Sequence, residues 1–250
     1  MLKENKYTEM QRRYYDSNVE LMKTTGNHRH HDANQDYWNV LLGVVKENPV
    51  CWDKKSAFDF GCGQGRNIVN LLRLANWDKV DGCDLSEGNL NYSKQNIEQE
   101  YGSMKQTTLF HTDGTGIGNV ASESYDFVMS TIVMQHICVY SIRFQILQEK
   151  YRILRREGIL SFQMGYDKTQ RHYRDYKEDF LEAEATNGMC DVTITNPQLM
   201  VDDLVKIGFR NIEYKILPSF SDSHEQWIYF QCQKYTAPRS RSKRGDQNGK

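Results

Sequence analysis

A short apolar segment that leads directly into three alternating glycines is the feature that most constrains the fold of this chain. The segment reads Ala57-Phe58-Asp59-Phe60-Gly61-Cys62-Gly63-Gln64-Gly65-Arg66-Asn67. The apolar run is typical of a buried strand, and the residues after the last glycine are predicted to form a helix. Glycine is needed where the backbone turns sharply or where a ligand approaches it closely, because a Cβ atom would occupy that space. We therefore predict a strand, a tight turn and a helix, with a ligand held against the backbone of the turn.

Strands and helices are predicted to alternate through the middle of the chain. From Ser56 to Met164, short apolar runs are separated by stretches of helical length, which indicates β-α-β-α order and a parallel sheet. Ser86 is predicted to cap one of the helices, because its hydroxyl can accept a hydrogen bond from a free amide of the first turn. The predicted strands are 57–60, 79–83, 107–111, 125–131 and 158–164, and the predicted helices between them are 67–75, 87–101 and 141–154.

The two ends of the chain differ from this middle part. Residues 1–50 are predicted to form a helical cap and residues 51–234 the main domain. Residues 235–250 are rich in Lys and Arg and have few apolar side chains to bury, so we predict a disordered basic tail.

The last part of the main domain begins with an insertion. Residues from about 165 to 195 are too many and too polar for a simple connection, and they are predicted to form either a lid or a loosely ordered segment. After it we expect a helix over 197–207, followed by strands at 211–217 and 227–233 that form an antiparallel hairpin. Gly208 is expected to end that helix.

Composition and charge exclude several classes of protein. The chain has 32 Lys and Arg against 33 Asp and Glu, so no overall field attracts it to nucleic acid or to a membrane. Its six cysteines are scattered and none has the C-x2-C spacing of a zinc ribbon. The strongest apolar runs, such as 127–134, are much shorter than the roughly 20 residues of a membrane-spanning helix, and no signal peptide opens the chain. We expect a cytoplasmic protein with free thiols.

The details of the glycine turn indicate the charge of its ligand. A dinucleotide-binding turn has the pattern G-x-G-x-x-G, whereas this turn has glycine at every second position and then Arg66. Asp59 lies two residues before the first glycine, at the end of the predicted strand. Its carboxylate would repel a pyrophosphate and attract an ammonium group. A cationic ligand is therefore favoured over a nicotinamide dinucleotide, and an NAD(P)-dependent oxidoreductase is the less favoured alternative.

The pattern Asp59-x-Gly61-x-Gly63-x-Gly65 resembles the first motif of the class I S-adenosylmethionine-dependent methyltransferases. The resemblance implies that the glycines pass under the methionine part of the cofactor and that Asp59 helps to hold its amino group. It also implies a second acid at the end of the next strand, where a carboxylate can accept hydrogen bonds from both ribose hydroxyls. Asp84 stands there, 19 residues after Gly65.

Three further segments follow the order of the family. Thr112-Asp113-Gly114 comes after the third strand, where the resemblance places the Asp side chain on the adenine amino group. Residues 125–137 resemble the fourth strand with its active-site loop, and residues 151–160 resemble the family's helix-turn-strand. The implied fold is α/β, with a Rossmann-like, seven-stranded, mostly parallel sheet, helices on both faces and a C-terminal antiparallel hairpin. The implied cofactor residues are Asp59, Gly61, Gly63, Gly65, Asp84, Leu85, Asp113, Gly114 and Thr131.

The sequence says less about the part of the expected site that would bind the methyl acceptor. If the acceptor is a hydroxyl, a base should remove its proton, and His136 is the candidate because it lies on the loop that should face the methyl group. Its alternative role is packing within that loop. The Gln135-His136 and Phe162-Gln163-Met164 segments resemble a subgroup of small-molecule methyltransferases that includes enzymes acting on sugars of surface polysaccharides. Five side chains of the insertion either line an acceptor pocket or lie exposed on the lid: Tyr166, His172, Tyr173, Arg174 and Tyr176.

The predicted activity is transfer of a methyl group from S-adenosylmethionine to a hydroxyl of a small molecule or sugar. No metal is expected, since the cluster from His28 to His31 lacks the separated spacing of known zinc sites. Four alternatives remain open: an N-methyltransferase acting on a small amine, a non-catalytic cofactor-binding module, the oxidoreductase, and a nucleic-acid methyltransferase that uses the basic tail. The oligomeric state is also open.

Overall fold

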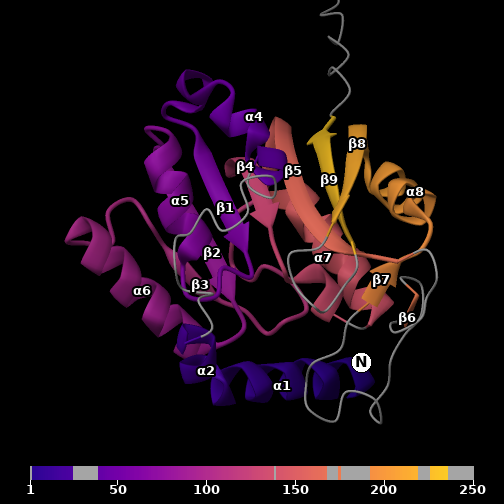
Figure 1. Ribbon diagram of the computed structural model, residues 1–250, viewed down its shortest axis with the longest axis horizontal. Helices are drawn as coiled ribbons and strands as arrows, with labels where there is room; N and C mark the ends of the chain where they lie inside the picture. Colours follow the sequence, from indigo (N-terminus) through magenta and orange to yellow (C-terminus); the bar gives the residue numbers. More distant parts are fainter. Residues whose placement is uncertain are drawn as a thin grey trace, which may run out of the picture.

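The computed structural model describes residues 2–24, 39–137, 139–167, 174–175, 192–218 and 226–235. The predictions made for His28 to His31, for His172, Tyr173 and Tyr176, and for residues 236–250 lie outside this part of the chain. The described residues form a mixed sheet with helices on both of its faces (Figure 1).

The strands of this sheet follow the predicted order closely. They are β1 (Ser56–Phe60), β2 (Lys79–Asp84), β3 (Leu109–His111), β4 (Tyr125–Ser130), β5 (Leu154–Tyr166), β6 (Arg174–Asp175), β7 (Val192–Ile194), β8 (Phe209–Pro218) and β9 (Gln226–Lys234). The central order is β3-β2-β1-β4-β5, and these five strands are parallel. Beyond β5, strand β9 runs antiparallel to both β5 and β8. This arrangement confirms the predicted fold class, including the C-terminal hairpin.

The helices lie where the sequence periodicity predicts them. They are α1 (Leu2–Ser17), α2 (Val19–Thr24), α4 (Gly43–Lys46), α5 (Arg66–Leu74), α6 (Glu87–Tyr101), α7 (Tyr140–Ile153) and α8 (Pro197–Ile207), with short 3-10 turns η1 (Pro49–Trp52) and η2 (Met134–His136). The predicted cap of α6 is confirmed, because the Ser86 hydroxyl accepts a hydrogen bond of 3.1 Å from the Asn89 amide. Gly208 ends α8 with a φ of +122°, as expected for a C-terminal glycine. None of the described helices is long and apolar enough to cross a membrane.

Alternate side chains of β1 enter two separate apolar cores. Phe58 and Phe60 pack with residues of α7 and α8 on one face of the sheet, whereas Ala57 packs with residues of α4, α5 and α6 on the other. Successive side chains of a strand point to opposite faces, so one short strand serves both cores. A strand buried on both faces explains the almost continuous apolar run before the glycines.

Two parts of the sheet depart from the sequence prediction. Strand β5 begins at Leu154 rather than at 158, and Glu157 takes a left-handed φ of +61° within it. The insertion supplies two short additional strands, since Gly165 and Tyr166 of β5 pair with β7, which in turn pairs with β6. The Tyr166 side chain is buried in the apolar core beside α7 and α8.

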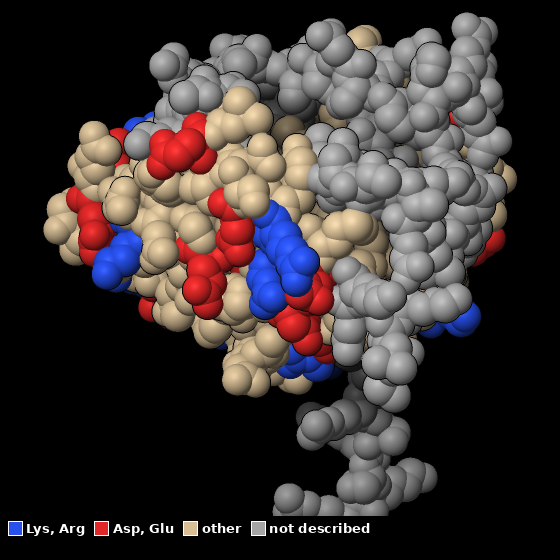
Figure 2. Space-filling model, turned by 90° about the horizontal axis from the view of Figure 1, so that it is seen from below, with Lys and Arg blue, Asp and Glu red and all other residues tan. Residues whose placement is uncertain are grey.

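Helices α1 and α2 lie across the carboxyl ends of the parallel strands (Figure 1). The Ser86 hydroxyl donates a hydrogen bond of 2.6 Å to Oδ1 of Asp16 on α1, and the Gln64 side-chain amide donates one of 2.9 Å to the Val19 carbonyl on α2. A Cβ atom at Gly88 would lie 2.7 Å from Cγ2 of Val19, so the glycine allows α2 to approach α6. The face seen in Figure 2 carries acidic and basic side chains interspersed, and its described part shows no broad area of one charge.

Candidate functional site

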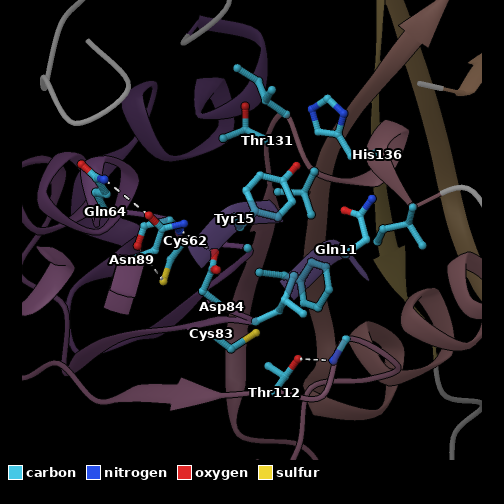
Figure 3. A pocket seen from close by; sticks show the side chains of 18 of the residues that line it. Gln11, Tyr15, Cys62, Gln64, Cys83, Asp84, Asn89, Thr112, Thr131 and His136 are labelled. Atoms are coloured by element: carbon cyan, nitrogen blue, oxygen red, sulfur yellow. Dashed lines mark hydrogen bonds between the residues drawn. The ribbon is translucent and has the colours of Figure 1, made fainter. Parts of the chain in front are cut away.

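A cavity of about 500 Å³ lies at the carboxyl ends of β1, β2 and β4 (Figure 3). In parallel α/β sheets this is the edge at which ligands bind. The lining residues come from three sources: the glycine turn and the start of α5, the ends of β2 to β4 with the loops that follow, and one face of α1 and α2. They include Gly61, Gly63, Arg66, Asn67, Asp84, Leu85, Thr112, Gly114, Thr131 and His136, together with Tyr7, Gln11, Tyr14, Tyr15 and Leu21.

The three glycines of the turn all have left-handed backbone conformations. The φ angles of Gly61, Gly63 and Gly65 are +72°, +51° and +86°. A Cβ atom at Gly61 would lie 2.4 Å from Cγ2 of Val133, and one at Gly65 would lie 2.5 Å from Oγ of Ser93. At Gly63 a Cβ atom would meet nothing within 4 Å, and this residue lines the cavity. The turn is therefore a backbone cradle that leaves space for a ligand at Gly63.

Asp59 is fully buried beside the glycine turn. Neither of its carboxylate oxygens has a hydrogen-bond partner among the described residues. Burial raises the pKa of Asp59 to about 7, although the Asn67 side chain and the positive charge of Arg66 both lower it. Asp59 does not itself line the cavity. A buried carboxylate without a partner, next to a ligand cradle, fits a cationic group brought by the ligand.

Asp84 lies at the end of β2 and lines the middle of the cavity (Figure 3). Its Oδ2 accepts a hydrogen bond of 2.9 Å from the Gly63 amide, and its Oδ1 accepts one of 2.9 Å from the Ser86 amide. Burial raises the pKa of this carboxyl above its usual value. The Leu85 amide and the Asn89 side chain also act on this carboxylate, and Asp84 faces the cavity as an acceptor for ligand hydroxyls. Leu85 lines the cavity next to it.

In the segment after β3, Thr112 and Gly114 line the cavity and Asp113 does not. Thr112 is buried and lines the cavity, and its Oγ1 accepts a hydrogen bond of 2.9 Å from the Gly114 amide. Asp113 is exposed, and its Oδ1 accepts hydrogen bonds from the amide and the hydroxyl of Thr115. Asp113 is not among the lining residues, whereas Gly114 is. The sequence pattern names the segment Thr112-Asp113-Gly114, and the conformation of the turn decides which of its side chains faces the cavity.

The loop after β4 brings Thr131 and His136 to the same end of the cavity (Figure 3). The Thr131 hydroxyl donates a hydrogen bond of 2.9 Å to Oε1 of Gln163 on β5. The Tyr7 phenol donates a hydrogen bond to the backbone carbonyl of His136, which ties α1 to this loop. Nε2 of the Gln135 side chain lies 3.4 Å from Nε2 of the His136 ring.

Helix α1 supplies a wall of the cavity that sequence reasoning missed. Tyr7, Gln11, Tyr14 and Tyr15 line it, and Tyr15 lies near the middle of the cavity in Figure 3. The helical spacing of these residues was the available signal, but that spacing indicates an apolar face without showing what the face covers. In the described part of the chain, no three His, Cys, Asp or Glu side chains come together as metal ligands.

Comparison with known proteins gives a consistent result. Residues 58–162 match the family model described as a methyltransferase domain. The human arsenite methyltransferase is 26% identical over 144 residues, which are 55% of this chain and 36% of that protein. The mouse arsenite methyltransferase is 28% identical over the same shares. The chain therefore spans about a third of the length of these curated relatives.

Three solved structures share the fold. One is phosphoethanolamine N-methyltransferase 2 of Haemonchus contortus, bound to phosphomonomethylethanolamine and S-adenosylhomocysteine, with a TM-score of 0.60, 18% identity, and 80% of this chain and 53% of that chain covered. DhpI in complex with SAH has a TM-score of 0.61 and 13% identity, covering 92% and 98%. The [4+2]-cyclase SpnF has a TM-score of 0.60 and 14% identity, covering 79% and 81%.

The sheet order, the backbone cradle and the acid at the end of β2 define a class I methyltransferase fold. Residues 58–162 match the methyltransferase-domain model, and the chain shares the fold of solved S-adenosylmethionine-dependent methyltransferases.

Proposed function

We propose that the chain binds S-adenosylmethionine in this cavity and that it methylates a hydroxyl group of an uncharged small molecule or sugar. The observation that carries the proposal is the cradle at Gly63, joined by hydrogen bonding to Asp84 and adjacent to the unpartnered carboxylate of Asp59. Two of the structural neighbours hold S-adenosylhomocysteine, the demethylated cofactor. The residues present fit a ligand that has a cationic amino group and two ribose hydroxyls.

The residues that would hold the cofactor divide along the cavity. Asp84 would accept hydrogen bonds from the ribose hydroxyls. Leu85 and Thr112 lie where the adenine would bind, and the glycine turn would hold the amino-acid end of the cofactor. When bound, the cofactor supplies an electrophilic methyl group on a sulfonium. Thr131 and His136 then mark the acceptor end, because the loop after β4 lies across the cavity from Thr112 (Figure 3).

His136 is the proposed base. The acceptor oxygen would bond to the methyl carbon as the carbon–sulfur bond breaks and leaves S-adenosylhomocysteine, and the proton of the acceptor hydroxyl would pass to the imidazole of His136. Tyr7 holds the backbone of His136, so the ring is carried by a loop that α1 restrains. The Thr131 hydroxyl donates its hydrogen bond to the Gln163 side chain, so its oxygen can still accept a hydrogen bond at the cavity wall.

The lining disfavours the acceptors of the named relatives. Arsenic(III) is a soft centre that prefers thiolates, but burial raises the pKa of Cys62 and Cys83, the cysteines among the described lining residues, so both remain thiols. A phosphate-bearing acceptor needs cationic side chains near it. Among the described lining residues, Arg66 at the glycine turn is the only Lys or Arg. The remaining aromatic, amide and hydroxyl groups favour an uncharged acceptor.

The test is calorimetric titration with S-adenosylmethionine, S-adenosylhomocysteine and NADH in parallel. Binding of the first two without NADH is expected, whereas binding of NADH alone would contradict the proposal. An acceptor screen then follows S-adenosylhomocysteine formation with sugars, small phenols, ethanolamine, phosphoethanolamine and arsenite. Turnover with a sugar or phenol supports O-methylation, turnover with phosphoethanolamine, which has an amine and no alcohol, identifies an N-methyltransferase, and binding without any turnover favours the non-catalytic module.

A further inference from the structure

Gly165 lies inside the sheet, at a position where the backbone does not require glycine. It belongs to the extended strand β5, and it pairs with Thr193 of β7 on one side and with Trp227 of β9 on the other. Glycine weakens the interior of a strand, and it often marks a place where a ligand or another segment of backbone approaches the sheet closely. The side chains around Gly165 therefore indicate what approaches it.

These side chains share one face of the sheet. Met164 and Tyr166 point into the core beside α7 and α8, so Gly165 faces the opposite side. Its direct neighbours in β7 and β9 face the same side, and so does Gln163, which pairs with Tyr229 of β9 and accepts a hydrogen bond from Thr131. We call this group the Gly165 patch; around the glycine it contains Thr131, Gln163, Thr193, Trp227 and Tyr229.

Two polar atoms of the Gly165 patch have no hydrogen-bond partner among the described residues. They are Nε2 of Gln163 and Oγ1 of Thr193, and both side chains are fully buried. Oε1 of Gln163 is already used, because the Thr131 hydroxyl donates to it at 2.9 Å. Buried polar groups are normally paired, since an unpaired one loses its hydration without compensation. Both atoms adjoin Gly165, so they mark hydrogen-bonding positions for a group that lies over the glycine.

The Gly165 patch adjoins the cavity at Thr131 and Trp227, which both line it. His136, the proposed base, lies with Thr131 at the same end of the cavity (Figure 3). The indole of Trp227 supplies a broad apolar surface, and every side chain of the patch is uncharged. This combination suits a neutral ligand with one flat apolar face and several hydroxyl groups.

We propose that the Gly165 patch binds the methyl acceptor and that the acceptor is a sugar ring. The ring lies over Gly165 with its C–H face against Trp227, and its hydroxyls pair with Nε2 of Gln163 and with the hydroxyl oxygens of Thr193 and Thr131. A simple phenol has one hydroxyl, which is the group to be methylated, so it leaves these three positions unpaired. The inference rests on the proposed function, which supplies the methyl donor, and it selects the sugar among the uncharged acceptors.

The experiment measures formation of S-adenosylhomocysteine at varied concentrations of the methyl pyranosides of glucose, galactose and mannose, with phenol as the comparison. We expect kcat/KM for at least one pyranoside to exceed that for phenol by about tenfold or more, since several hydrogen bonds distinguish the two. Gly165→Ala places a Cβ atom where the ring lies, and it should raise KM for that pyranoside at least about tenfold. Gln163→Leu and Thr193→Val should each raise KM about three- to tenfold, the usual effect of one neutral hydrogen bond.

Ser161→Ala is the matched control. Ser161 lies on the same face of β5, but its hydroxyl donates a buried hydrogen bond of 2.8 Å to the Leu41 carbonyl, outside the Gly165 patch. Its KM for the pyranoside should equal that of the wild type. Calorimetry with S-adenosylhomocysteine checks each variant, and the affinity should stay within about twofold, because the glycine turn and Asp84 lie on other strands. If Gly165→Ala does not fold, Thr193→Val decides the test, since valine has nearly the shape of threonine.

Three results would overturn the inference while cofactor binding stands. The first is turnover of phenol without turnover of any pyranoside, and the second is S-adenosylhomocysteine binding without turnover of either. The third is a wild-type KM in both Gly165→Ala and Thr193→Val, or a loss of S-adenosylhomocysteine affinity in these variants as large as the rise in KM, which a purely structural defect would give. Wild-type protein that binds neither S-adenosylmethionine nor S-adenosylhomocysteine would overturn the proposed function itself.

Discussion

The Gly63 amide donates a 2.9 Å hydrogen bond to Oδ2 of Asp84, and this contact joins the turn after β1 to the end of β2. The two residues are 21 positions apart in the sequence. Parallel strands bring their carboxyl ends to the same edge of a sheet, so each motif meets the next one there. Asp84 consequently has two roles, because the carboxylate that faces the cavity also stabilises the cradle.

Asp84→Ala should abolish measurable binding of S-adenosylhomocysteine. The variant loses the acceptor for the ribose hydroxyls and leaves the Gly63 and Ser86 amides without their partner. We expect the affinity to fall by at least about a hundredfold, corresponding to roughly 3 kcal/mol, and the far-UV circular dichroism to stay close to that of the wild type. Calorimetry measures the first and spectroscopy the second. Unchanged affinity would exclude Asp84 from the ribose contact.

Asp113 and Thr112 provide a paired test of the adenine end. Asp113→Ala removes an exposed side chain whose hydrogen bonds go to Thr115, so the affinity for S-adenosylhomocysteine should stay within about twofold. Thr112→Val removes a buried hydroxyl that lines the cavity and accepts from the Gly114 amide, so the affinity should fall by about three- to tenfold. The opposite order of effects would support the family pattern, in which the acid contacts the adenine.

The pKa of Asp59, about 7, predicts a pH dependence of cofactor binding. An ammonium group bound nearby favours the ionised carboxylate, so binding releases a proton wherever the free protein holds Asp59 protonated. The affinity for S-adenosylhomocysteine should be constant well above pH 7 and should fall by up to about tenfold per pH unit below it. Titrations in buffers of different ionisation enthalpy count the protons released. Asp59→Asn is the control, and a profile with the same slope in that variant would assign the titration to another group.

Sequence patterns predicted the fold well because its signals are local. The apolar run before Gly61, the Ser86 cap and the glycine at 208 each depend on neighbouring residues, and the observed strands and helices begin and end close to the predicted positions. Strand β5 and the two strands of the insertion depart from the prediction, and near the start of β5 Arg155 pairs at 2.7 Å with Asp126 of β4, a residue 29 positions away.

The candidate site was predicted only in part, for the same physical reason. Family motifs mark the turns at Gly63 and Asp84, but they do not show which side chain of a turn faces inward, as Thr112 and Asp113 demonstrate. The contact between Tyr7 and His136 spans 129 positions, and nothing in the spacing of α1 indicates it.

Lys150 is a fully buried cation whose replacement should stabilise the protein. Its Nζ lies 3.2 Å from Sδ of Met134 and 4.5 Å from the Phe60 ring centre, and burial lowers its pKa to about 7. A Lys with a lowered pKa in the folded state binds its proton more weakly there than in the unfolded chain, so stability decreases as the pH falls from about 10.5 to 7 and is then constant.

Lys150→Met removes the destabilisation that the buried ammonium group causes and keeps a side chain of similar length. The gain in the free energy of unfolding should be near zero above pH 10.5, should increase as the pH falls, and should reach at most about 5 kcal/mol below pH 7. Denaturant titrations at pH 6, 8 and 10 measure it, and Lys94→Met on the exposed surface of α6 is the control. A gain that does not depend on pH would show that packing, and not the buried charge, limits stability here.

His136→Gln should separate chemistry from binding. The residue lines the acceptor end of the cavity, whereas Asp84 and the glycine turn hold the cofactor end, so the affinity for S-adenosylhomocysteine should stay within about threefold of the wild type. Turnover of the acceptor found by the screen should fall by about 10² to 10⁴, the usual contribution of a general base.

The matched variant is Tyr7→Phe, which keeps the imidazole and removes the hydrogen bond to its backbone. Loosening the loop that carries the base should lower the turnover rate less than removing the base. At saturating substrate, the turnover rate of Tyr7→Phe should therefore lie between that of the wild type and that of His136→Gln. Equal turnover in wild type and His136→Gln would show that the acceptor needs no base from this loop.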